Sequence, residues 1–189
     1  NKDISALESF LKSSLGSIIS KVFFVFVHTF STPLKDDSFS VTDNNVLFAD
    51  SLFVHQFDAG ERGFSIREEG QLDMRMNQDG ELTALEVVND YSEKELFRIF
   101  KSYGEISNTG KLVSVIASER RNGKITTTAD LIKVLDKCAP KHREHKYYAQ
   151  VFQAIRIEVN DELGVLEQFL NQMDAVIKPG GKLVVMSYH

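Results

Sequence analysis

Residues 178–189 read KPGGKLVVMSYH, and they decide the fold class because they turn a helical stretch back into a strand. The Pro-Gly-Gly turn ends one pattern, and the β-branched run after it starts another. Ahead of this turn, apolar residues recur at helical spacing over about residues 83–177. Near the start of the chain, residues 22–27 (VFFVFV) predict a strand buried on both faces, as in the interior of a parallel sheet. The order predicts an α/β sheet domain with a large helical insertion.

Further elements fill in this outline on both sides of the insertion. Apolar spacing predicts an amphipathic helix over about residues 3–21, and short strands at 39–42 and 46–49. Residues 55–80 keep neither a helical nor a strand period, which is typical of a long ordered loop. The sheet domain is therefore expected on either side of a loop and a helical block.

Capping signals mark the helices inside the insertion. Ser92 with Glu95, and Thr127 with Asp130, have the spacing of capping boxes, so each pair predicts a helix start. Another helix is expected to stop near Gly123. The pattern from about residue 148 to 177 predicts one long helix.

Composition excludes several classes of protein. The 189 residues are 42% hydrophobic, which is typical of a folded domain, and the net charge of −5 excludes a polybasic nucleic-acid binder. The longest apolar run covers only residues 22–27, far short of the roughly 20 residues of a membrane-spanning helix. Cys138 is the single cysteine, so neither an intrachain disulfide nor a zinc site is expected. These features favour a soluble, cytoplasmic protein without a metal.

Positive charge gathers in one segment of the insertion. Residues 117–147 hold eight Lys and Arg against four Asp and Glu. Two interpretations stay open: a solvated helix face, or a patch that binds an RNA backbone. The second interpretation makes Arg120, Arg121 and Lys124 candidate RNA contacts.

An arginine-rich loop precedes the helices and holds the densest cluster of polar residues. Residues 61–67 (ERGFSIR) and 72–77 (LDMRMN) interleave Arg62, Arg67 and Arg75 with apolar anchors. Such a loop suits a polyanion or a flipped base. The alternative is an ordinary network in which carboxylates pair with these arginines and pin the loop to its scaffold.

A polar stripe is predicted on one helix further along the chain. Gln153, Arg156 and Asn160 fall at i, i+3 and i+7, which places them on one helix face. The stripe is expected either to line a site or, as the favoured alternative, to form hydrogen bonds that tie this helix to the arginine-rich loop.

Several long motifs, in order, carry a family resemblance. Residues 57–65 (FDAGERGFS), 72–77, 151–162 (VFQAIRIEVNDE) and 178–189 resemble the RsmH (MraW) family of S-adenosylmethionine-dependent rRNA methyltransferases. The resemblance covers about residues 46–189, and several of these stretches are most similar to the sequences of Bacteroidetes-type members.

The resemblance implies a class I methyltransferase-like (Rossmann-like) sheet, here incomplete, with a large helical insertion. It implies a partial sheet portion at 1–60, the helical insertion with the arginine-rich loop at 61–177, and a return strand at 178–189. The implied reaction methylates the exocyclic amino group of a cytosine in 16S rRNA, with S-adenosyl-L-methionine as cofactor. The implied partner is small-subunit rRNA or the 30S subunit.

The resemblance also implies roles for individual residues. Asp50 and Gln56 occupy cofactor-contacting positions, and Asp73 and Arg75 are weak candidates for catalysis. Candidates for binding the substrate or RNA are Arg62, Arg67, Arg120, Arg121, Lys124 and Arg156.

The sequence departs from the family pattern in three places. The family has a short Gly- and Ser-containing stretch after the strand acid, whereas residues 50–56 (DSLFVHQ) lack the glycine and place Gln56 one residue too close to Asp50. Gly16 is the single glycine of the first fifty residues, so the family's glycine-rich cofactor loop is missing. The family also continues past the equivalent of Tyr188-His189. These departures predict an incomplete enzyme with weak cofactor binding. The alternative function is that of a truncated or degenerate relative that binds RNA without catalysis.

Overall fold

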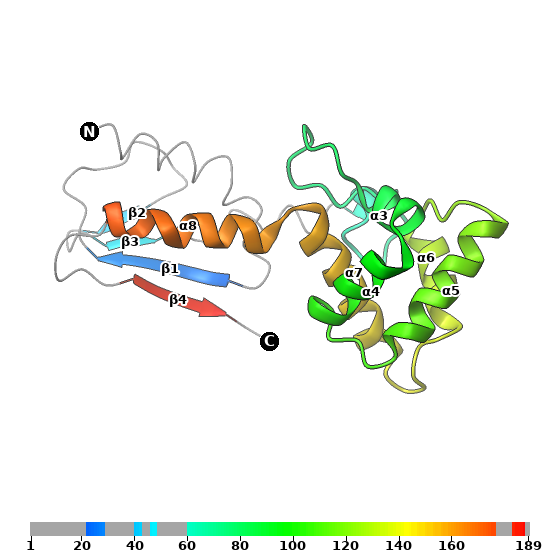
Figure 1. Ribbon diagram of the computed structural model, residues 1–189. Helices are drawn as coiled ribbons and strands as arrows, with labels where there is room; N and C mark the ends of the chain where they lie inside the picture. Colours follow the sequence, from blue (N-terminus) through cyan, green and yellow to red (C-terminus); the bar gives the residue numbers. More distant parts are fainter. Residues whose placement is uncertain (1–21, 29–39, 43–45, 49–59, 177–182, 188–189) are drawn as a thin grey trace. The chain divides into compact units, whose positions relative to one another are not determined.

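The computed structural model describes residues 22–28, 40–42, 46–48, 60–176 and 183–187. The helix predicted over residues 3–21 lies outside these ranges. The chain divides into two compact units (Figure 1). The first unit combines residues 1–54 and 162–189, and the second covers 55–161.

The described strands of the first unit form one four-stranded sheet. They are β1 (Val22–His28), β2 (Ser40–Thr42), β3 (Val46–Phe48) and β4 (Leu183–Ser187), in the order β2-β3-β1-β4. All four fall on the stretches where the sequence predicts strands. The described pairings are all antiparallel, which corrects the parallel neighbours expected for residues 22–27. An apolar run indicates that both faces of a strand are buried, but it does not indicate the direction of the neighbouring strands. That direction depends on the connections between strands.

The second unit is helical (Figure 1). After a short 3-10 helix, η1 (Gly60–Arg62), and a long loop come the following helices: α3 (Ala84–Asp90), α4 (Glu93–Ser102), α5 (Thr109–Asn122), α6 (Thr128–Asp136) and α7 (Glu144–Val159). Both predicted capping boxes are confirmed: Ser92 caps α4 through Glu95, and Thr127 caps α6 through Asp130.

The prediction of one helix over residues 148–177 is wrong. The chain breaks between α7 and α8 (Glu162–Val176), and Asp161 between them has a positive φ of 45°. Such a left-handed backbone cannot continue an α-helix. Asn160 ends α7 because its side chain bonds to a loop far away in sequence, as described below.

The core of the second unit includes part of the loop. Phe100 of α4, Leu112 of α5, Leu131 of α6 and Ile155 of α7 are fully buried in one apolar cluster. Leu72 and Met74 of the loop belong to the same cluster. The loop that holds the candidate site residues is therefore a packed part of the unit.

No helix within the described ranges is long and apolar enough to cross a membrane.

Cys138 is buried in the core cluster, and burial raises the pKa of its thiol. A thiol with a raised pKa is a poor nucleophile, so Cys138 serves packing.

Candidate functional site

Backbone hydrogen bonds hold the arginine-rich loop against its own unit. The Leu72 N–H donates to the Thr126 carbonyl at 3.1 Å, and the Thr128 N–H donates to the Gly70 carbonyl at 2.9 Å. Within the loop, the Met74 N–H donates to the Arg62 carbonyl at 2.9 Å. The loop is thus ordered without regular secondary structure of its own.

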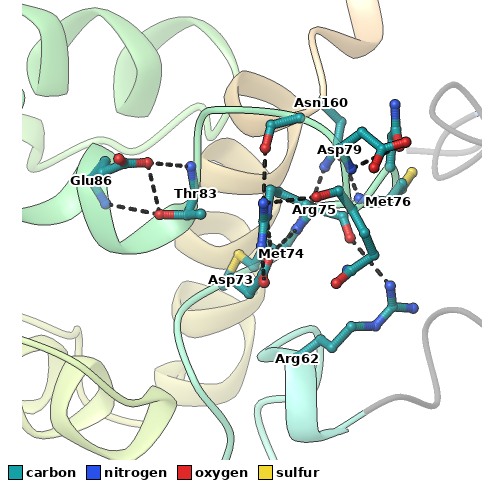
Figure 2. A network of polar contacts seen from close by, with 12 residues as sticks. Arg62, Asp73, Met74, Arg75, Met76, Asp79, Thr83, Glu86 and Asn160 are labelled. Atoms are coloured by element: carbon teal, nitrogen blue, oxygen red, sulfur yellow. Dashed lines mark hydrogen bonds and ion pairs between the residues drawn. The ribbon is translucent and has the colours of Figure 1, made fainter.

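Asn160 connects the end of α7 to this loop (Figure 2). Its Oδ1 accepts the Met76 N–H at 2.7 Å, and its Nδ2 donates to the Met74 carbonyl at 2.8 Å. Nδ2 also lies 2.9 Å from the Arg156 carbonyl. These contacts correspond to the favoured interpretation of the polar stripe, in which it ties the helix to the loop.

The other two members of the stripe lie differently. Gln153 Nε2 donates to the Tyr103 carbonyl at 3.4 Å, so it links α7 to the end of α4. The Arg156 side chain is partly buried, and its predicted contact with RNA stays a prediction.

Asp73 and Arg75 pair with each other (Figure 2). Arg75 Nε and Nη2 donate to the two Asp73 carboxylate oxygens, each at 2.8 Å. Arg75 Nη1 also donates to the carbonyls of Gln78 and Gly80, at 2.9 and 2.8 Å. The contacts are those of the alternative in which an Arg–carboxylate network pins the loop.

The pair also affects what Asp73 can do chemically. The hydrogen bond from Arg75 lowers the pKa of the Asp73 carboxyl, and the nearby Arg75 and Arg62 charges act in the same direction. A carboxylate with a lowered pKa is a weaker base. This environment suits Asp73 for positioning better than for proton abstraction.

Met74, between the two partners, has a positive φ of 57° and is buried. This conformation is uncommon for a residue with a side chain. Its carbonyl accepts from Asn160 and its N–H donates to Arg62, so contacts from two directions hold the turn. The turn that carries Asp73 and Arg75 is therefore specified by long-range contacts.

The remaining loop arginines are more open. Arg62 Nη1 donates to the Arg75 carbonyl at 3.4 Å, and the Arg62 guanidinium lies 5.4 Å from the centre of the Phe64 ring. Arg67 is exposed, and its backbone N–H donates to Ser65 Oγ. For both arginines, binding of the substrate or RNA stays a prediction.

The cations of the basic segment divide into engaged and exposed groups. Arg120 Nη1 donates to the Tyr91 carbonyl at 2.6 Å and to the Val88 carbonyl at 3.4 Å, so it binds the end of α3. Arg121 and Lys124 are exposed, although Arg121 Nε donates to its own helix at the Ala117 carbonyl. A contact of Arg120 with RNA would compete with its bonds to α3, while Arg121 and Lys124 are accessible.

Some predicted site residues fall outside the described ranges. They are Asp50 and Gln56. Within the part of the chain that the structure describes, no three His, Cys, Asp or Glu side chains gather as metal ligands.

The sequence of the whole chain matches the model of the MraW methylase family over residues 2–189. This chain belongs to the MraW methylase family. The match confirms the resemblance seen in the motifs and extends it over residues 2–45, which the motifs did not reach.

Curated relatives carry the name ribosomal RNA small subunit methyltransferase H. The protein from Cytophaga hutchinsonii is 50% identical over 135 residues, which are 71% of this chain and 45% of the relative. The Christiangramia forsetii protein is 48% identical with the same coverage, and the Bacteroides fragilis protein is 47% identical and covered to 44%. The chain thus spans less than half the length of these relatives.

Sequence reasoning missed one polar cluster in this MraW methylase family member. The Tyr91 hydroxyl donates to Glu158 Oε1 at 2.9 Å, and Arg98 Nη2 donates to the same oxygen at 2.6 Å. Burial and the Glu158 carboxylate raise the pKa of Tyr91 to about 12. The cluster joins α4 to the last turn of α7, beside the position of Asn160.

It also missed the start of α3 and the contacts of Asn89. Thr83 and Glu86 form a capping box, and their spacing of three residues is a signal that the sequence alone contains. Asn89 accepts the Ile125 N–H at 3.0 Å and donates to the Ile125 carbonyl at 2.9 Å. No local pattern marks this second contact, because its partner lies 36 residues away.

Proposed function

We propose that this chain carries an S-adenosyl-L-methionine-dependent methyltransferase that acts on the exocyclic amino group of a cytosine in small-subunit rRNA. Its membership of the MraW methylase family is the observation that carries the proposal. The names of the relatives from three organisms support the rRNA substrate.

The proposed architecture is a class I methyltransferase sheet with a helical insertion. The unit of residues 55–161 corresponds to the insertion, and the unit of 1–54 and 162–189 to the sheet domain. This division differs from the predicted boundary at residue 177, because α8 groups with the sheet. The parallel strand order of a complete class I sheet is not among the described pairings.

The chemistry sets what the protein must provide. Bound S-adenosyl-L-methionine supplies an electrophilic methyl group on a sulfonium. The amino nitrogen of cytosine is a weak nucleophile because its lone pair is delocalised into the ring, so placement of the base in line dominates catalysis. A base must also leave its stack before an enzyme can reach it. A loop held as rigidly as residues 72–77 suits this positioning task.

The loop carries this positioning role in the proposal. Asn160 fixes the backbone of Met74 and Met76, and Asp73 with Arg75 fixes the turn between them. Arg62, which borders this turn, offers a guanidinium for a phosphate or a base. No catalytic base is assigned.

The described residues do not by themselves fit the cofactor. The charged side chains of Asp73 and Arg75 already bond to each other, so neither is available to a ribose or a carboxylate. We assign the cofactor contacts to Asp50 and Gln56, which the family resemblance implies, and we derive no step through them. The 30S subunit is the proposed partner, and the cytoplasm the proposed location.

A methyl-transfer assay tests this function. The chain is incubated with labelled S-adenosyl-L-methionine and either small-subunit rRNA or 30S subunits. The proposal expects label on a cytosine amino group. RNA binding without transfer would instead support the alternative of a degenerate RNA-binding module.

A further inference from the structure

A short basic segment precedes α7, drawn in yellow in Figure 1. Residues 141–146 read KHREHK, which places three cations and two imidazoles within six residues. Lys141, Arg143 and Lys146 are all exposed. We call these six residues the basic turn.

Several cations of the second unit are engaged within the unit, while others, such as Lys94, Lys101 and Lys124, are exposed like those of the basic turn. Lys137 pairs with Glu119 at 2.7 Å, Lys133 pairs with Asp130 at 3.3 Å, and Arg120 binds the end of α3. The described part of the chain offers no ion-pair partner to Lys141 or Lys146. Their charge is therefore directed to solvent.

The acidic groups near the basic turn have partners of their own. The Asp136 carboxylate accepts the Tyr148 hydroxyl. Glu144 Oε1 accepts the His142 N–H at 3.0 Å, so this carboxylate serves the backbone of the turn. The local positive charge is only partly offset, in a chain whose net charge is −5.

The turn is held in one shape. The Arg143 N–H donates to the Pro140 carbonyl at 3.2 Å, and the Tyr147 N–H donates to the Arg143 carbonyl at 3.0 Å. Tyr147 is buried, and Asn108 Nδ2 donates to the Cys138 carbonyl at 2.9 Å just before the turn. An ordered turn loses less conformational entropy on binding than a flexible tail does.

We infer that the basic turn binds the phosphate backbone of RNA, whereas Arg120 is held by its bonds to α3. Lys and Arg supply the charge that releases counterions from phosphates, and Arg and His planes stack on unpaired bases. The inference rests on the proposed function, because that function makes RNA the substrate.

Two double variants of the 189-residue chain test the inference. K141Q/K146Q removes two exposed cations from the basic turn, and K94Q/K101Q removes two exposed cations from α4 as a matched control. Affinity for a decoding-region RNA fragment is measured from about 50 to 200 mM salt. Thermal unfolding by circular dichroism checks that both variants fold.

The expected result is specific to the basic turn. Each lysine that contacts a phosphate should reduce the slope of log affinity against log salt by about 1, so K141Q/K146Q should reduce it by about 2. The control should keep the wild-type slope. If the wild-type chain binds RNA but K141Q/K146Q has the same slope as K94Q/K101Q, this inference is overturned and the proposed function is not affected.

Two other outcomes separate it from its alternatives. A wild-type chain that binds no RNA would overturn the inference and the proposed function together. If K141Q/K146Q kept full affinity for naked RNA but lost affinity for 30S subunits, the turn would recognise an acidic protein surface, and the RNA assignment would be wrong.

Discussion

The Asn160 side chain accepts the backbone N–H of Met76 at 2.7 Å, across 84 residues of sequence. The same carboxamide donates to the Met74 carbonyl, so one side chain makes two hydrogen bonds with the loop backbone, as a neighbouring strand would (Figure 2). This contact ends α7 and fixes the turn that holds Asp73 and Arg75. The order of the arginine-rich loop thus depends on a residue at the end of a helix.

Replacement of Asn160 should loosen the loop. N160A removes both long-range bonds and leaves a partly buried N–H and carbonyl unpaired, so the free energy of unfolding should fall by about 1–3 kcal/mol. N160D keeps the acceptor and loses the donor, and should also destabilise the protein. Urea unfolding is the measurement, with N122A on exposed Asn122 as control. Equal stability of N160A and N122A would show that the contact is not important.

The Asp73–Arg75 pair should make stability depend on pH. Because Arg75 lowers the Asp73 pKa in the folded state below its ordinary 3.8, the stabilisation is complete above that value and is lost as pH falls through the lower folded pKa. The stability difference between wild type and D73N should therefore shrink as the pH falls below about 4. Exposed Asp79, as D79N, is the control. A difference that grew on acidification would contradict the pairing.

Two glycines should respond oppositely to alanine. Gly63 has φ +80°, and an added Cβ would lie 2.3 Å from the Gln71 carbonyl oxygen, so G63A should destabilise the loop by more than about 1 kcal/mol. Gly110 is the second residue of α5 and has open space around it, so G110A should stabilise the protein by up to about 1 kcal/mol. Thermal unfolding of both variants measures this. A neutral G63A would contradict the described path of the loop.

Arg120 and Arg121 should contribute differently to stability. R120Q removes charged hydrogen bonds to the Tyr91 and Val88 carbonyls, so it should lower the free energy of unfolding by about 1–3 kcal/mol. R121Q should leave stability within about 0.5 kcal/mol of wild type. Chemical unfolding of R120Q and R121Q measures both free energies. A larger loss of stability in R121Q than in R120Q would contradict the described contacts of Arg120.

Local signals made much of the helical unit predictable. The capping boxes at Ser92 and Thr127 depend on partners three residues away, so the sequence alone locates these helix starts. The Asp73–Arg75 pair is also local, and it was anticipated as one of two alternatives for the loop.

Most of the misses share a physical cause, which is the distance along the chain between the residues in contact, whereas the missed capping box of Thr83 and Glu86 is local. The break at Asn160 depends on Met74 and Met76, and the position of Arg120 depends on the carbonyls of α3. Helical periodicity contains neither contact. The direction of the neighbours of β1 likewise depends on strands distant in sequence.

Methyl transfer to small-subunit RNA is the decisive assay for the proposed activity. The chain is given labelled S-adenosyl-L-methionine in large excess, since the sequence predicts weak cofactor binding, and the RNA is digested and separated by mass. We expect label on the amino group of a single cytosine, and a greater loss of methyl transfer in N160A than in N122A. Absence of label in the wild type, or label on another base, would contradict the proposed activity.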